Sequence, residues 1–185
     1  MKGLFLMLLP MPLLAAEEWP CMQPLVPSVS LEMVWNGPPL APAGDWREDR
    51  DLADLVTAIS TPETDAEEGN AKLMRFLQSR KQNRARTVSR LMTGLIDENN
   101  ATRARIVERL KMLGERQKGL ADVATRLNDE RDRAGSAADQ ELIDRANFAQ
   151  RTYLSAQSTL RYACDIPGRL DQRLGMYAKT LENAR

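Results

Sequence analysis

Two cysteines, Cys21 and Cys164, carry the most reactive side chains of this chain. They could pair as a disulfide, or one of them could act as a reactive thiol beside a group that lowers its pKa. The chain has no histidine and no CxxC motif, so neither of the usual activating neighbours is present. The missing histidine also excludes Ser-His-Asp and Cys-His nucleophile systems, a histidine general base and His-ligated zinc.

Acidic side chains gather around a Gly-Ser pair and could in principle bind a cation. Their order lacks the D-x-[DN]-x-[DN]-G pattern of an EF-hand loop, so a solvated turn is the simpler interpretation. Phosphate-binding loops, GxGxxG, GxSxG and Glu-x-x-His motifs are also missing. The sequence predicts a non-enzymatic protein with no catalytic, cofactor-binding or metal-ligating residues. The acidic residues concerned are Asp129, Glu130, Asp132, Asp139, Glu141 and Asp144.

Charge is segregated along the chain although its net charge is zero. Lys72 to Lys118 holds thirteen basic and four acidic residues, whereas Asp45 to Glu68 holds nine acidic residues and two arginines. Three interpretations stay open: internal neutralisation, which we favour, a solvated helix face, and a face for an anionic partner such as lipid headgroups or a polyanionic glycan. Nucleic acid is not expected as a partner, because only Phe76 could stack on bases. The possible anion-binding face is Lys72, Arg75, Arg80, Lys81, Arg84, Arg86 and Arg90.

Residues 1–16 have the layout of a cleavable signal peptide. Lys2 precedes a short apolar run that ends at Ala15 and Ala16. The run is too short for a membrane span, and its two prolines argue against both a membrane span and a buried helix. No second apolar stretch follows, so we expect no transmembrane anchor. Export would place both cysteines in an oxidising compartment, where a Cys21–Cys164 disulfide is expected rather than two free thiols.

Residues 17–44 form a Pro-rich segment with six of the ten prolines and two of the three tryptophans. The prolines exclude a continuous helix, and the apolar content is too high for a disordered linker. We therefore expect an extended arm that lies over another element. A peptide that becomes ordered only on a partner protein is the alternative.

Residues 45–185 have helical patterns throughout. Asp45 and Glu48 resemble a capping box before a short helix of about 46–60, and Thr61-Pro62-Glu63 is a second start signal. Residues 71–133 contain no proline and predict one long helix or two in succession. Asp97–Asn100 is the one plausible break.

The C-terminal residues carry a heptad pattern, which predicts a long helix over about 137–183. Pro167 lies on this seam and should kink the helix, because proline removes the hydrogen bond to the Ala163 carbonyl. The seam comprises Leu142, Ala146, Ala149, Tyr153, Ala156, Leu160, Ala163, Pro167, Leu170, Leu174, Tyr177 and Leu181.

The partner of this seam is an apolar stripe on the preceding helical segment, so the fold class is all-α with a long antiparallel hairpin. A reversal at residues 134–136 places Cys164 opposite about residue 106, where a disulfide would pin the arm across the middle of the hairpin. A homodimer formed through the seam is the alternative to packing within one chain. The stripe comprises Val88, Leu91, Leu95, Ile106, Leu110, Leu113, Leu120, Ala124 and Leu127.

Short motifs in the arm and near the kink are Trp19-Pro20-Cys21, Val26-Pro27, Trp35-Asn36-Gly37-Pro38-Pro39 and Tyr162–Pro167. With the long helices between them, they make the chain resemble an uncharacterised family of exported proteobacterial proteins. The resemblance implies a periplasmic location and pairing of Cys21 with Cys164. It implies no activity and no site residues.

These patterns predict a periplasmic scaffold or adaptor that meets a protein partner of the envelope through its helical surface. A periplasmic chaperone that holds unfolded envelope proteins is the first alternative, motivated by the basic segment and the exposed length. An accessory subunit that clamps an envelope enzyme with its N-terminal arm is the second.

Overall fold

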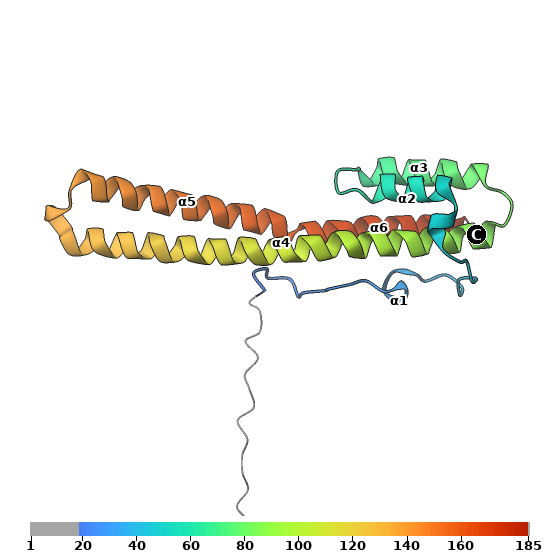
Figure 1. Ribbon diagram of the computed structural model, residues 1–185, viewed down its shortest axis with the longest axis horizontal. Coiled ribbons are helices and arrows are strands. Elements are labelled where there is room, and N and C mark those ends of the chain that lie inside the picture. Colours follow the sequence, from blue (N-terminus) through green and yellow to red (C-terminus); the bar gives the residue numbers. More distant parts are fainter. Residues whose placement is uncertain (1–18, 185) are drawn as a thin grey trace, which may run out of the picture.

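A computed structural model describes residues 19–184 and confirms the all-α fold built on a long antiparallel hairpin (Figure 1). The predicted signal peptide lies outside these residues. In chain order the elements are α1 (Leu31–Val34), η1 (Trp46–Glu48), α2 (Arg50–Ser60), α3 (Ala66–Ser79), α4 (Arg84–Ala134), η2 (Gly135–Ala137), α5 (Gln140–Cys164) and α6 (Ile166–Asn183).

The hairpin pairs α4, a single helix of 51 residues, with α5 and α6 in succession. Every position of the predicted heptad seam is buried or half-buried, because each faces α4 or the helices beside it. The chain reverses at Gly135, whose φ of 52° is a conformation that glycine adopts without the steric cost of a side chain. The predicted reversal and the packing of the seam within one chain are therefore confirmed.

The sequence predicts one helix or two over residues 71–133, with Asp97–Asn100 as the plausible break; no break occurs there, since α4 passes through it without interruption. The division between two helices lies instead at residues 80–83, where Asn83 adopts the left-handed conformation with φ 53°. Two polar residues of this run have partners far away in the sequence, because Asp97 accepts from the Trp46 indole and Asn100 binds the backbone of Val29. Polarity here reflects tertiary contacts rather than a helix end.

The start of α3 also differs from its prediction. The helix begins at Ala66 and is capped by Asp65, whose carboxylate accepts hydrogen bonds from the two backbone N–H groups of residues 67 and 68. The earlier signal at Thr61-Pro62-Glu63 belongs to a loop, in which Thr61 and Thr64 hydrogen-bond each other and Thr64 donates to the Ala58 carbonyl.

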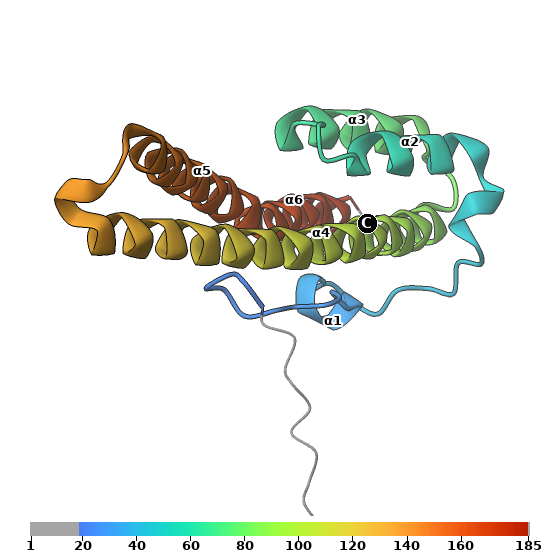
Figure 2. The same cartoon turned by 60° about the vertical axis from the view of Figure 1, so that its left-hand side comes forward.

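Near Pro167 the predicted single helix is divided in two. The end of α5 at Cys164 and the start of α6 at Ile166 are separated by Asp165, and the proline occupies the first turn of α6. A proline is accommodated there because the first N–H groups of a helix have no partner within the helix. Figure 2 shows α5 and α6 running in different directions from this point.

The main hydrophobic core lies at one end of the hairpin, where α2 and α3 cover α6 and the first half of α4 (Figure 1). We call this part, together with residues 19–49, the base. Beyond the disulfide, α4 and α5 continue without further helices over them, and residues 110–160 are called the outer hairpin. Its core is a small cluster of Ala124, Leu127, Ala146 and Ala149, with Leu142 and Tyr153 packed against it.

Buried Arg173 of α6 completes the C-terminal end of α2. Its guanidinium donates to the carbonyl oxygens of Ser60 at 2.8 Å, Thr61 at 2.5 Å and Thr64 at 3.2 Å. The last carbonyls of a helix have no partner within the helix, so a cation at this position supplies the missing donors and opposes the helix dipole.

Tyr177 lies one turn further along α6 and donates to the Ile59 carbonyl at 3.1 Å. Burial raises the pKa of its hydroxyl, so the group stays a neutral donor. Gly69 of α3 makes this contact possible, because a Cβ at that position would overlap the tyrosine oxygen. The base is thus held by two long side chains of α6 that reach the end of α2.

Candidate functional site

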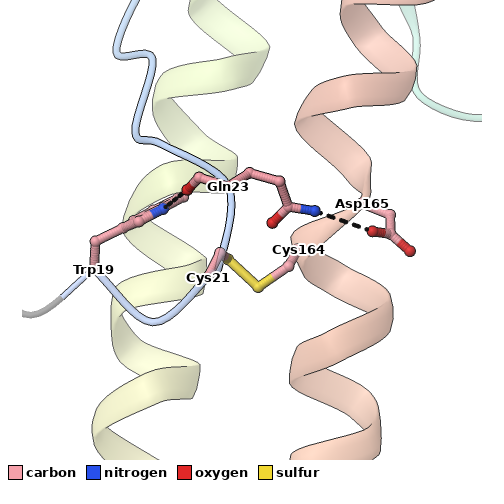
Figure 3. The surroundings of a disulfide bond; sticks show 5 residues. All are labelled: Trp19, Cys21, Gln23, Cys164 and Asp165. Carbon is pink, nitrogen blue, oxygen red and sulfur yellow. Dashed lines mark hydrogen bonds between the residues drawn. A yellow bond between two sulfur atoms is a disulfide. The ribbon is translucent and has the colours of Figure 1, made fainter.

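The predicted disulfide between Cys21 and Cys164 is present at the middle of the hairpin, with its sulfur atoms 1.99 Å apart (Figure 3). Pro20 packs against Gly114 of α4, where a Cβ would lie 2.6 Å from the proline Cβ. Gln23, two residues after Cys21, donates a hydrogen bond to Asp165, the residue after Cys164, at 3.3 Å. The arm is therefore pinned across α4 and the junction of α5 with α6, as predicted.

Asn100 of α4 holds the extended backbone of the arm. Its amide oxygen accepts from the Val29 N–H at 2.8 Å, and its amide nitrogen donates to the Val29 carbonyl at 2.9 Å. This pair of hydrogen bonds satisfies both backbone groups of one buried residue, much as a neighbouring strand would.

We expect Asn100→Ala to lower the free energy of unfolding by about 1–2 kcal/mol, because two buried backbone groups lose their partners while the helix gains a better helix former. Hydrogen exchange at the Val29 amide should accelerate. Asn128→Ala is the matched control, since Asn128 lies on the same helix, far from the arm, and hydrogen-bonds Gln150 of α5. Unchanged exchange at Val29 would contradict this account of the arm.

Two further side chains of α4 hold the end of the arm and the short helix η1 that follows it. Arg90 donates to the Ala43 carbonyl at 2.6 Å and pairs with Glu48 at 2.8 Å. The buried indole of Trp46 donates to Asp97 at 2.8 Å. With Asn100 and Arg103, discussed next, these two α4 side chains form what we call the arm clamp (Arg90, Asp97, Asn100 and Arg103).

Arg103 is the most deeply buried charge among the described residues, with 2% of its surface exposed. It donates to the Val26 carbonyl of the arm at 3.1 Å, to the Pro167 carbonyl at 3.4 Å and to the carboxylate of Asp171. The fixed fork of the guanidinium suits this role, because it can serve the arm and α6 at once. A cavity of about 460 Å³ lies beside it, lined also by Trp19 and Cys164.

The residues of the predicted anion-binding face do not share one environment. Several form ion pairs with acidic residues of the segment 48–68, as internal neutralisation predicts: Lys72 with Glu68, Arg80 with Asp49 and Asp51, and Arg90 with Glu48. Arg84 donates to the Leu77 carbonyl. Within the described part of the chain, Arg75, Lys81 and Arg86 have no ion-pair partner, so binding of an anion stays a prediction for these three.

The acidic residues near the reversal are used locally. Asp139 caps α5 by accepting from the Leu142 N–H at 2.8 Å, Asp144 accepts from Gln140 at 2.9 Å, and Asp132 pairs with Arg131. Among residues 19–184, no group of three potential ligands lies close enough to hold a metal ion.

The outer hairpin carries an apolar groove on one face, between α4 and α5. The groove measures about 620 Å³ and is lined by Leu120, Val123, Leu127 and Phe148. It continues toward the base as a second hollow of about 360 Å³ that shares Leu120 and Phe148 and reaches Leu113. Phe148 is 66% exposed and Val123 is 38% exposed. An exposed aromatic side chain that lines an apolar groove is a feature of surfaces that bind another protein.

Sequence reasoning missed this groove because Phe148 and Val123 lie beside the seam rather than on it. Phe148 directly precedes the seam residue Ala149, at a heptad position that a two-helix hairpin leaves exposed. The sequence signal that could have indicated the groove is a large aromatic residue, Phe148, beside the small seam residues Ala146 and Ala149.

None of the described helices is long and apolar enough to cross a membrane. The disulfide is consistent with an oxidising compartment outside the cytoplasm. No protein family model matches the chain, and searches among the curated proteins and the solved structures find no significant match to it.

Proposed function

We propose that this chain is a non-enzymatic scaffold or adaptor of the periplasm that binds protein through its outer hairpin. The single observation that carries the proposal is the groove around Phe148, which is apolar and leaves this side chain largely exposed. No other helix covers this part of the hairpin (Figure 2). An aromatic side chain left 66% exposed contributes little to the stability of the monomer, because most of its apolar surface stays in water. Burial of this side chain against a partner would give the groove its binding energy.

The rest of the molecule supports a docking role, because it fixes the end of the outer hairpin that is nearest the base. The disulfide joins the arm to Cys164, and Arg103 of α4 donates both to the arm at Val26 and to the Pro167 carbonyl at the start of α6. A preformed surface loses less conformational entropy on binding than a mobile one. The cavity beside Arg103 supports catalysis less well, since its carboxylates at Asp165 and Asp171 are engaged by Gln23 and Arg103.

The experiment that tests the proposal places a photoreactive amino acid at residue 148 of the exported protein in its own envelope. We expect crosslinks to one defined protein from position 148, and none from position 154, where Leu154 is also exposed but does not line the groove. Equal crosslinking from both positions, or none from either, would contradict the proposal.

A periplasmic chaperone is the second candidate, favoured by the arginines that flank the groove, Arg116 and Arg151. It predicts that the protein suppresses aggregation of a denatured outer-membrane protein, more strongly at low salt than at high salt. No suppression at either salt concentration would remove this candidate. The accessory-subunit hypothesis has less support, because Trp35 of the arm is buried within the chain.

A further inference from the structure

We propose that the groove of the outer hairpin receives a second copy of the same chain. Two outer hairpins would pack antiparallel about a two-fold axis near Phe148 and form a four-helix bundle, with the two bases at its opposite ends. The inference rests on the proposed function, since it uses the same groove, and it names the protein that fills it.

The groove face is free along its length for such a partner. The arm contacts α4 at Gly114, and Val123 follows nine residues later. At about 100° per residue these two positions lie on opposite sides of the helix. Since α2 and α3 cover only the base, a second outer hairpin could occupy the groove without displacing any described element (Figure 1).

The charges along the groove have opposite signs at its two ends. The end near the reversal is lined by Glu141, Asp144 and Arg145, and the end near the base by Arg116 and Arg151. Of these five residues, only Asp144 has a hydrogen-bond partner within residues 19–184, the side chain of Gln140. One end is therefore net negative, the other is positive, and most of the charge is available to a partner.

This pattern is self-complementary only when the second copy runs antiparallel. Measured from Phe148 along α5 at about 1.5 Å per residue, Asp144 lies about 6 Å toward the reversal and Arg151 about 4.5 Å toward the base. A two-fold axis at Phe148 inverts this direction, so Arg151 of the second copy would lie at nearly the same height as Asp144 and on the same side of Phe148 around the helix. Arg145, also about 4.5 Å from Phe148, lies on the other side of Phe148 at about 100° per residue. A parallel copy would instead place Arg151 against its own equivalent.

The same construction matches the outer pair of charges. Arg116 lines the hollow together with Ala156, which lies about 12 Å from Phe148 toward the base. Glu141 lies about 10 Å from Phe148 in the other direction. The two-fold axis therefore places two opposite-charge pairs, Asp144 with Arg151 and Glu141 with Arg116, on each side of an apolar centre. A surface that matches itself in this way can form a closed symmetric dimer. The charges set the direction of packing, and burial of Phe148, Leu120 and Val123 supplies the affinity.

The first test is the mass of the purified, disulfide-bonded protein in solution, measured by sedimentation equilibrium. We expect a dimer that Phe148→Glu converts to a monomer with unchanged helical content. Leu154→Glu is the matched control, because Leu154 is 48% exposed on the same helix and lies outside the groove, and this variant should stay dimeric. A wild-type protein that is monomeric up to high micromolar concentrations would overturn the inference.

The second test is charge reversal, which reads the direction of packing. Asp144→Arg and Arg151→Asp should each weaken self-association at least tenfold, since each places like charges together twice per dimer. Both substitutions in one chain should restore it, because the pairs are then reversed on both sides. Single variants that associate like the wild type would overturn the antiparallel arrangement.

The outcomes separate this inference from the proposed function. A monomeric protein whose residue 148 still crosslinks to a different envelope protein would overturn the dimer and leave the adaptor role standing. A monomer without crosslinks at residue 148 would overturn both. A dimer with the charge-reversal behaviour above, whose crosslinks at residue 148 join two copies of the chain, would support the dimer.

Discussion

Replacement of both cysteines, Cys21→Ser with Cys164→Ser, is expected to lower the free energy of unfolding by about 5 kcal/mol. The bridge closes a loop with a sequence separation of 143 residues, and on the chain-entropy model its removal restores that much freedom to the unfolded chain. Chemical denaturation monitored by circular dichroism measures the change. The helical signal before unfolding should be unaltered, because the seam and the main core do not depend on the bond.

The same variant should show where the bond acts in the folded state. We expect faster hydrogen exchange in residues 19–26, since the disulfide is their covalent attachment to the hairpin, and little change at Val29, which Asn100 holds independently. The wild-type protein under reducing conditions is the chemical control and should behave alike. A loss of exchange protection throughout the arm would contradict independent anchoring.

Arg173→Met is expected to lower the free energy of unfolding by about 3 kcal/mol. The substitution keeps an apolar stem of similar length but removes the donors to the carbonyls of Ser60, Thr61 and Thr64, and the Ser60 carbonyl is buried. Denaturation midpoints at neutral pH measure the effect, which should include loss of the last turn of α2.

Arg169→Met is the matched control, because Arg169 lies one turn earlier on α6 and is exposed beside Tyr162. Its substitution should change stability by less than about 0.5 kcal/mol, as is usual for surface positions. Equal effects from the two substitutions would show that helix propensity, rather than the end of α2, accounts for the loss.

The long-range architecture could be predicted because a heptad repeat encodes both the helix and the face that it buries. The same reasoning located the reversal, the kink at Pro167 and the register that brings Cys164 to the middle of the hairpin. It could not decide whether the helix breaks at Asp97–Asn100, because a polar run inside a helix looks like a helix end when its partners lie far away in sequence. Asn100 binds Val29, 71 residues earlier, and no local pattern indicates that contact.

The surfaces were harder to predict than the fold. The sequence shows that basic residues are concentrated in one segment, but it does not show which acidic residues lie beside them in the folded protein. Asp49 and Asp51, for example, pair with Arg80. Phe148 was overlooked because a single aromatic residue outside the heptad seam produces no periodic pattern in the sequence. Its exposure becomes visible only when the rest of the outer hairpin is seen to leave it uncovered.

The position of the two cysteines orders the biogenesis of this protein. Cys21 is synthesised before its partner, which lies 143 residues later in the chain. The bond can therefore form only after α4 and α5 have been made. Until then Cys21 is a free thiol, and because the chain has no third cysteine, its only wrong partners are other molecules. Oxidation thus locks the arm to a hairpin whose helices α4 and α5 have already been synthesised.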